Sequence, residues 1–185
     1  MNPTDAADST STAASRLCAE CGLCCNGVMF HKAMLQPGEK PGQLAALGLR
    51  IMRKKGGHYL AQPCAAHTGT RCSVYEGRPL RCRIFACRQL RRAMAGEITE
   101  AAALEKIRDA RQRVAEIEAL LHEAGPTDVK RPLSLRCEKI AAVPPDPADH
   151  AAVELRRRLA QEFLELDALL DADFRVPPEE KCGGE

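Results

Sequence analysis

Apolar side chains recur every three or four residues along a first stretch of the C-terminal half. The members of this stripe are Ala103, Ile107, Ala110, Val114, Ile117 and Leu121. Their spacing places them on one face of an α-helix. Thr99 can cap the start of that helix, and Gly125-Pro126 stops it. The pattern therefore predicts a helix of about seven turns between these signals.

A second stripe with the same spacing follows a Pro-containing connection that reaches Pro147. Its members are Ala152, Leu155, Leu159, Phe163, Leu166 and Leu170. Asp146 is the expected N-cap, with Pro147 at the first helical position, and Pro177-Pro178 ends the helix. The two stripes predict a long C-terminal antiparallel helical hairpin over residues 98–174. They pack on each other or, alternatively, form the seam of a homodimer.

Residues 16–97 contain Gly and Pro throughout and no long periodic stretch. We expect only short elements here, namely a strand within Val28–Leu35, a helix over Gln43–Gly48, and a hairpin that joins Leu49–Met52 to Tyr59–Ala61. Residues 1–15 are expected to form a disordered tail and residues 175–185 a flexible one. The predicted fold class is mainly α, with an irregular cysteine-rich metal-binding half before the helical hairpin.

Composition points to the cysteines as the unusual feature of the chain. At 185 residues with 45% hydrophobic and 28% charged residues, it can bury the core of one domain. Large aromatic anchors are scarce, because there are four Phe, two Tyr and no Trp. The ten cysteines exceed ordinary usage. In a reducing compartment, clustered cysteines indicate metal binding or catalysis rather than disulfides.

Charge and hydropathy exclude several classes of partner. Lys and Arg number 27 against 25 Asp and Glu, so the net charge of +2 provides no strong field for attracting nucleic acid. Residues 1–15 lack the apolar run of a secretory signal, and no stretch of the sequence has the 18 or so consecutive apolar residues of a membrane span. We therefore expect a cytoplasmic protein that binds neither membranes nor nucleic acid.

Four cysteines near the N-terminus follow a C-x-x-C-x-x-C-C pattern: Cys18, Cys21, Cys24 and Cys25. Two intervening residues let a loop turn around a soft cation, and Gly22 and Gly27 permit the positive φ angles that such turns need. The first three thiolates can therefore ligate one centre, either zinc or an iron-sulfur cube. Adjacent residues rarely direct both side chains to one small centre, so Cys25 serves a second centre or stays unligated.

Four further cysteines are spaced more widely: Cys64, Cys72, Cys82 and Cys87. Zinc ribbons and fingers normally supply two short pairs, and only the gap between Cys82 and Cys87 is short. A four-residue gap of this kind also occurs in plant-type ferredoxins. All eight cysteines are thus candidate metal ligands. They suffice for two four-ligand sites, or for one site and several free thiols.

The cysteine run, together with the segment CSVYEGRPLRCRIFAC over residues 72–87, resembles the bacterial cysteine-cluster family with a zinc- or iron-chelating domain. All eight cysteines match the family pattern. The resemblance covers Leu17 to about Arg92 and leaves out the C-terminal helices, Cys137 and Cys182. It implies metal binding. A related cysteine cluster in flagellin lysine methylases is associated with iron-sulfur binding.

Six arginines surround the second cysteine group: Arg78, Arg81, Arg83, Arg88, Arg91 and Arg92. Their charges would stabilise the anionic centre that four thiolates form with zinc or with an iron-sulfur cube. The sequence carries no nucleotide fingerprint and no paired carboxylates, so we assign no catalytic residue and do not expect an independent enzyme.

We interpret the chain as a metal-binding cysteine-cluster protein with a redox, metal-handling or accessory role. The cofactor is an iron-sulfur cluster or zinc, and the cluster-like spacing of the first group favours iron-sulfur. The alternatives are a zinc-stabilised adaptor whose helices bind another protein, and an accessory to a modification enzyme.

Overall fold

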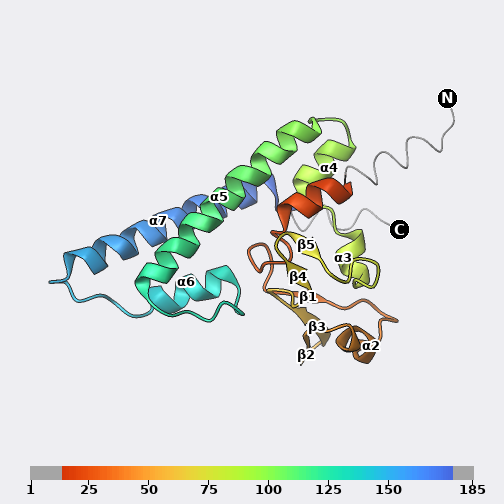
Figure 1. The fold of residues 1–185 in the computed structure, drawn as a ribbon, viewed down its shortest axis with the longest axis horizontal. Helices are drawn as coiled ribbons and strands as arrows, with labels where there is room; N and C mark the ends of the chain where they lie inside the picture. The colour runs from red at the N-terminus through yellow and green to blue at the C-terminus, as the bar shows by residue number, and fades with distance from the viewer. Residues whose placement is uncertain (1–13, 177–185) are drawn as a thin grey trace.

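The computed structural model describes residues 14–176, in which a long helical part lies beside a smaller cysteine-rich part (Figure 1). Helix 14–21 is followed by β1 (Lys32–Met34), α2 (Pro41–Ala46), β2 (Ile51–Lys54), β3 (Gly57–Ala61), β4 (His67–Thr68), β5 (Arg71–Cys72), α3 (Leu80–Ile84), α4 (Arg88–Met94), α5 (Glu100–Ala124), α6 (Leu133–Ala141) and α7 (His150–Asp173). The mainly α fold class is confirmed. Most of the two expected tails, with Cys182, lies outside the described residues.

Helix α5 begins and ends where the apolar stripe and its flanking signals predict. The Thr99 side chain accepts a hydrogen bond from the Ala102 N–H over 3.1 Å, which satisfies one of the free donors of the first turn. Gly125 follows the last helical residue with a φ of 124°. A side chain at this position would be strained, so the helix stops there.

Helix α7 begins at His150, and the predicted start at Pro147 is wrong. Asp149 is the N-cap, because its carboxylate accepts a hydrogen bond from the Ala152 N–H over 3.0 Å. The Asp146 carboxylate instead accepts from the Ala148 N–H in the preceding turn. Two aspartates three residues apart can both cap a helix, and the one nearer the apolar stripe does so.

Helices α5 and α7 lie side by side and run in opposite directions (Figure 1). Lys106 near the start of α5 pairs with Asp173 at the end of α7 over 3.0 Å, and Arg113 pairs with Glu165 over 2.7 Å. The connection between them, predicted without a helix, contains α6. Arg136 of α6 is 6% exposed and binds Glu118 of α5 through two contacts of 2.5 and 2.6 Å. This pair docks α6 against α5.

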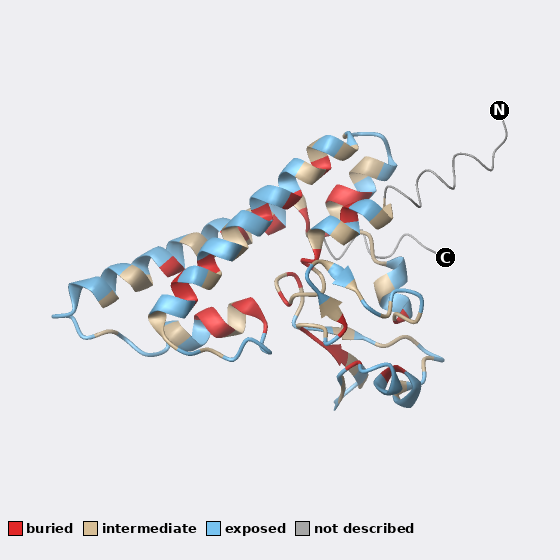
Figure 2. Cartoon of the chain, viewed as in Figure 1, coloured by how far each residue is buried: buried red, intermediate tan, exposed pale blue. Residues whose placement is uncertain are grey.

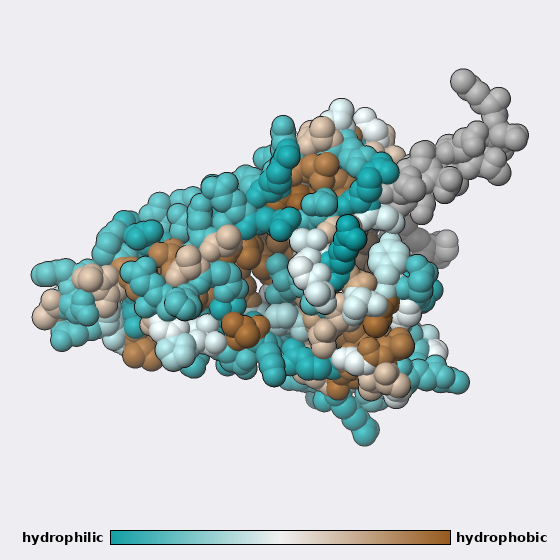
Figure 3. Space-filling view, in the orientation of Figure 1, coloured by the Kyte–Doolittle hydropathy of each residue, from teal (hydrophilic) through white to brown (hydrophobic). Residues whose placement is uncertain are grey.

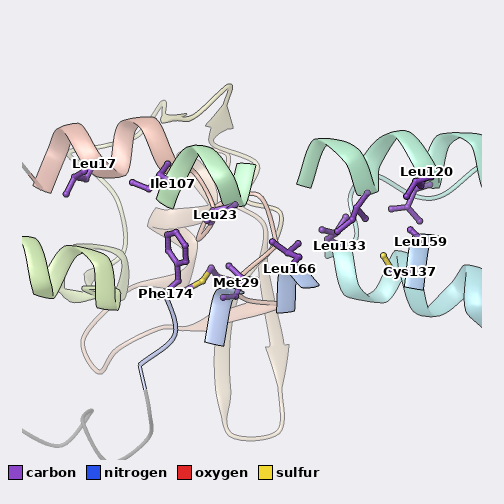
Figure 4. Packing of buried hydrophobic residues seen from close by; sticks show 14 of the residues in the cluster. Leu17, Leu23, Met29, Ile107, Leu120, Leu133, Cys137, Leu159, Leu166 and Phe174 are labelled. Carbon is purple, nitrogen blue, oxygen red and sulfur yellow. The ribbon is translucent and has the colours of Figure 1, made fainter. Parts of the chain in front are cut away.

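One continuous core joins the helices to the first part of the cysteine-rich chain. Figure 2 shows buried segments where α5, α6 and α7 face one another, and Figure 4 shows Leu23, Met29 and Phe174 packed at the end of this core. Its fully buried members include Leu23, Ile117, Leu121, Leu166, Leu170 and Phe174. The cysteine-rich run is therefore anchored on the helical core through apolar neighbours of its cysteines.

Truncation of a core leucine in α7 should destabilise the protein. Leu166 is 1% exposed, so Leu166→Ala removes buried apolar atoms and leaves a cavity. We expect the free energy of unfolding to fall by about 2–5 kcal/mol in chemical denaturation. Leu164 on the same helix is 67% exposed, and its replacement by alanine should change stability by less than about 0.5 kcal/mol. Equal losses in the two variants would contradict the described packing.

The predicted hairpin is present in the cysteine-rich part, where β2 and β3 pair antiparallel with Ile51 opposite Leu60. Of the expected strand over 28–35 only β1 forms, and it pairs with the other side of β3. A satellite core of four buried residues lies beneath this sheet: Leu44, Leu49, Leu60 and Ala66. Between residues 14 and 176, no helix is both long enough and apolar enough to span a membrane.

Candidate metal centre

The C-x-x-C-x-x-C-C run begins on helix 14–21 and ends in the turn that follows. Gly22 has the positive φ that the sequence predicts, 67°, and it ends a helix that the sequence pattern did not predict. A Cβ at this residue would lie 2.8 Å from Nε2 of His67, closer than the two groups can approach. The turn thus needs glycine both for its left-handed backbone and for the close contact with His67 of β4.

Gly27 brings the end of the run against two distant segments. Its φ is 80°, and a Cβ would lie 3.1 Å from Cδ of Pro63 and 3.2 Å from Cα of Pro132. Its carbonyl accepts a hydrogen bond from the Leu133 N–H over 3.3 Å at the start of α6. The position of the run relative to both parts of the chain therefore depends on a residue without a side chain.

Gly27→Ala should lower stability and bound metal together. The left-handed backbone costs about 1–2 kcal/mol with a side chain, and the crowded Cβ adds strain against Pro63. Gly42 is a matched control, because it lacks a left-handed φ and a Cβ there would meet open space. Thermal melting and metal analysis should detect the loss in Gly27→Ala only. A Gly27→Ala protein as stable and as metal-rich as Gly42→Ala would be inconsistent with this geometry.

The cysteines of the second group lie on four separate segments of the chain. Cys64 follows β3, and its N–H donates to the Cys25 carbonyl over 2.7 Å. Cys72 lies on β5 opposite His67 of β4. Cys82 lies on α3, and Cys87 is the N-cap residue of α4.

All eight predicted cysteines line one cavity of about 870 Å³. The other cysteine with a described environment, Cys137, is buried on α6 in the helical core, where Figure 4 places it near Leu159. The structure therefore gathers the cysteines that match the family pattern and separates Cys137 from them.

A first quartet consists of Cys18, Cys21, Cys24 and Cys87. Cys21 and Cys87 pack against the main core. Burial raises the pKa of Cys21 to about 12, and the thiolate charges of Cys87 and Cys18 contribute to this rise. The charge of Cys87 also contributes to the raised pKa of Cys18 and of Cys24, and on this basis we group Cys87 with the first three cysteines of the run.

A second quartet consists of Cys25, Cys64, Cys72 and Cys82. The last three pack against the satellite core. Burial raises the pKa of Cys25 to about 12, with the charges of Cys64, Cys82 and Cys72 as the next causes. Burial raises the pKa of Cys82 to about 11, and the charges of Cys64 and Cys72 add to it. The Cys25 carbonyl also accepts the Cys64 N–H over 2.7 Å, and on this basis we group Cys25 with the second group of cysteines.

The eight thiols line a cavity and do not converge on a single position. Within residues 14–176, no three His, Cys, Asp or Glu side chains converge closely enough to hold a single metal ion. A zinc ion bound by four thiolates requires all four sulfur atoms at about 2.3 Å from the metal. An iron-sulfur cube binds each thiolate through a different iron atom, so its ligands stand further apart.

The sequence model of the CxxCxxCC family matches residues 17–116, more than half of the chain. The chain belongs to this family. The family is described as a "putative zinc- or iron-chelating domain". Comparisons with curated proteins and with solved structures find no match. The CxxCxxCC match contains all eight cavity cysteines and reaches into α5, so it is longer than the resemblance, which was expected to end near Arg92.

Backbone N–H groups around the CxxCxxCC cysteines favour the thiolate form. The Leu23 N–H acts in this way on Cys21 and the Ala66 N–H on Cys64, while the His67 N–H binds the Cys64 carbonyl over 3.0 Å. The backbone at Leu90 and Gln89 lowers the pKa of Cys87, whose side chain makes no capping hydrogen bond to α4. Burial raises the pKa of each of these cysteines, and the donated hydrogen bonds counter the rise. Such donors are suited to thiolates that ligate a metal.

The charged side chains that line the CxxCxxCC cavity are all cationic: Lys32, Arg71, Arg78, Arg81 and Arg91. Among the described residues no Asp or Glu lines it. The Arg78 guanidinium stacks on the Tyr75 ring, 3.7 Å from its centroid, which fixes one cation at the cavity wall. The wall is therefore suited to an anionic occupant.

The other three predicted arginines have different partners. Arg83 donates to the carbonyls of Glu76 and Arg78, over 2.6 and 3.1 Å. Arg88 binds the Asp171 carbonyl at the end of α7, and Arg92 pairs with Glu97 over 3.5 Å. Arg83 and Arg88 thus bind backbone carbonyls and Arg92 forms a surface ion pair, and none of the three lines the cavity.

Two buried glutamines also line the cavity, and no sequence pattern singled them out. Gln89 is 2% exposed and Gln62 is 5% exposed. The Gln62 side-chain oxygen and both polar atoms of the Gln89 amide lack a hydrogen-bond partner. A glutamine near a cysteine is ordinary in a sequence, so only the fold identifies them as part of the site.

Proposed function

We propose that this chain is an iron-sulfur electron carrier in which each quartet holds one cluster. The observation that carries the proposal is a single cavity whose wall presents eight cysteines, which we assign to two groups of four. Two four-thiolate groups match the ligand requirement of two iron-sulfur cubes. The family description covers zinc and iron alike, and the geometry favours iron.

The volume of the cavity supports a cluster over a bare ion. Its volume of about 870 Å³ is far larger than a single metal ion. The cavity is partly open to the surface, so a ligand can enter it from solvent. Zinc ions would fill little of it, and the thiols would have to move inward to form tetrahedra. Two cubes would occupy far more of the space. They would also require smaller movements of the cysteine side chains than zinc ions would.

The charges of the cavity wall support an anionic occupant in particular. A cube with four thiolate ligands is negative, and two of them would place several negative charges in one cavity. The cationic side chains that line the wall offset part of that charge. Apolar neighbours such as Phe30, Leu60 and Leu90 line the same wall, and Cys18 is the one exposed cysteine among the eight.

Two features support a role in electron transfer: the redox activity of iron-sulfur clusters and the short separation of the two proposed centres. Iron-sulfur clusters accept and release single electrons, at potentials that the surrounding protein sets. The adjacent residues Cys24 and Cys25 belong to different quartets, so one peptide unit joins the two sites. The chain would therefore hold the two centres within short reach of each other. Reduced thiols of this kind fit the cytoplasm.

The proposal is tested by purification without oxygen, followed by iron and acid-labile sulfide analysis and a visible spectrum. We expect iron and sulfide in equal amounts and a broad visible absorption that bleaches on reduction. Zinc has a filled d shell and gives no such colour. Colourless protein with zinc and without sulfide would refute the proposal.

A zinc-stabilised adaptor is the second candidate, and exposed apolar side chains favour it. Leu47, Leu80 and Ile84 are 45%, 43% and 58% exposed in the cysteine-rich part. Figure 3 shows hydrophobic surface on this part, whereas hydrophilic side chains cover much of the long helices. Such side chains can contact another protein. Stoichiometric zinc in the purified protein would favour this function over electron transfer.

A further inference from the structure

The Gln89 side chain is buried without any hydrogen-bond partner among the described residues. It lies on α4, two residues after Cys87, and is 2% exposed. Neither its side-chain nitrogen nor its side-chain oxygen has a hydrogen-bond partner within the described chain. A buried amide that makes no hydrogen bond destabilises a protein, and most buried polar side chains are paired.

The position of Gln89 indicates where the partner lies. Gln89 is one of the residues that line the cavity of the eight cysteines, and it follows Cys87, the N-cap residue of α4, by two positions. Cys87 belongs to the first quartet. An amide has two N–H donors, and the sulfur atoms of a metal-thiolate centre are acceptors.

We propose that the Gln89 side-chain amide donates a hydrogen bond to a sulfur atom of the centre held by the first quartet. This inference rests on the proposed function, because it requires a metal centre in the cavity. A hydrogen bond to the sulfur of a reduced, more negative centre is stronger than one to the oxidised centre. Gln89 would therefore raise the reduction potential of one of the two centres.

The test compares Gln89→Met with wild type in the metal-free and the loaded state. Methionine has nearly the volume of glutamine and no donor. In metal-free protein the variant should melt higher, by roughly 2 to 10 °C, because it removes an unpaired buried amide. In loaded protein it should melt lower, because the hydrogen bond to the centre is lost. The shift in melting temperature should therefore have opposite signs in the metal-free and the loaded protein, whichever metal is bound. A purely structural role of Gln89 would not produce this reversal.

The second measurement is a redox titration of the loaded protein. We expect the reduction equilibrium constant of one centre to fall roughly tenfold or more in Gln89→Met, with the other centre unchanged. Gln43→Met on the exposed face of α2 is the control and should change neither quantity. If the variant loads fully, shows unchanged potentials and has one sign of melting shift in both states, the inference is wrong.

The outcomes separate this inference from the proposed function. If the wild-type protein binds zinc, electron transfer is refuted. The signs of the two melting-temperature shifts in Gln89→Met then still test the role of Gln89. Wild type that binds no metal overturns both. A loaded variant without the reversal overturns the role of Gln89 and leaves the iron-sulfur proposal standing.

Discussion

Replacing Cys24 by serine should remove one metal centre, and replacing its neighbour Cys25 should remove the other. The two cysteines are adjacent in sequence, but Cys24 belongs to the first quartet and Cys25 to the second. Serine is a poor ligand for soft metals, so each variant should lose about half of the bound iron and acid-labile sulfide. The double variant should lose nearly all of both.

Spectroscopy can show that the two losses are different. The reduced Cys24→Ser and Cys25→Ser proteins should each show the paramagnetic signal of one centre, and the two signals should add up to that of wild type. Cys137→Ser is the control, because Cys137 is buried on α6 away from the cavity. It should keep the full iron content. Identical residual signals in the two variants, or complete loss in both, would argue against separate quartets.

Removal of the centres should loosen the cysteine-rich part and leave the long helices folded. The satellite core contains only four buried apolar residues, and three cysteines of the second quartet pack against it. This part therefore depends on metal binding for stability, as small metal-binding domains do. Apart from Ile107, which lines the cavity, the buried apolar side chains of α5, α6 and α7 pack in the main core away from it.

Hydrogen exchange of the metal-free protein measures this difference directly. We expect protection to fall most between Lys32 and Cys87 and to persist in α5 and α7. Leu17, Leu23 and Met29 pack on the main core, so the segment around them should keep partial protection. Uniform loss of protection along the chain would show instead that the centres hold the whole fold together.

The long helices were predictable because their signals are local. Thr99, the apolar stripe and Gly125 lie within one continuous segment, and α5 matches them at both ends. Helix α6 was missed because it has only nine residues and is fixed by distant partners. Its N-terminal Leu133 binds the Gly27 carbonyl, and its Arg136 binds Glu118. A sequence pattern does not contain such contacts.

The site was predictable in its chemistry and less so in its arrangement. Cysteine spacing identified all eight cavity residues and indicated that Cys25 points away from its neighbours. It could not assign Cys87 to the first quartet, because that depends on how α4 docks. The Arg88 N–H binds the Phe174 carbonyl after α7, a contact between residues 86 positions apart. The unpaired Gln89 amide follows from the same docking.

Native mass spectrometry of protein purified without oxygen tests the two-centre account most directly. The method keeps non-covalent centres bound and reports their number and mass on each chain. The account predicts two added masses per chain, each equal to one cube of four iron and four sulfide atoms. A single cube, or added masses that correspond to zinc ions alone, would contradict it.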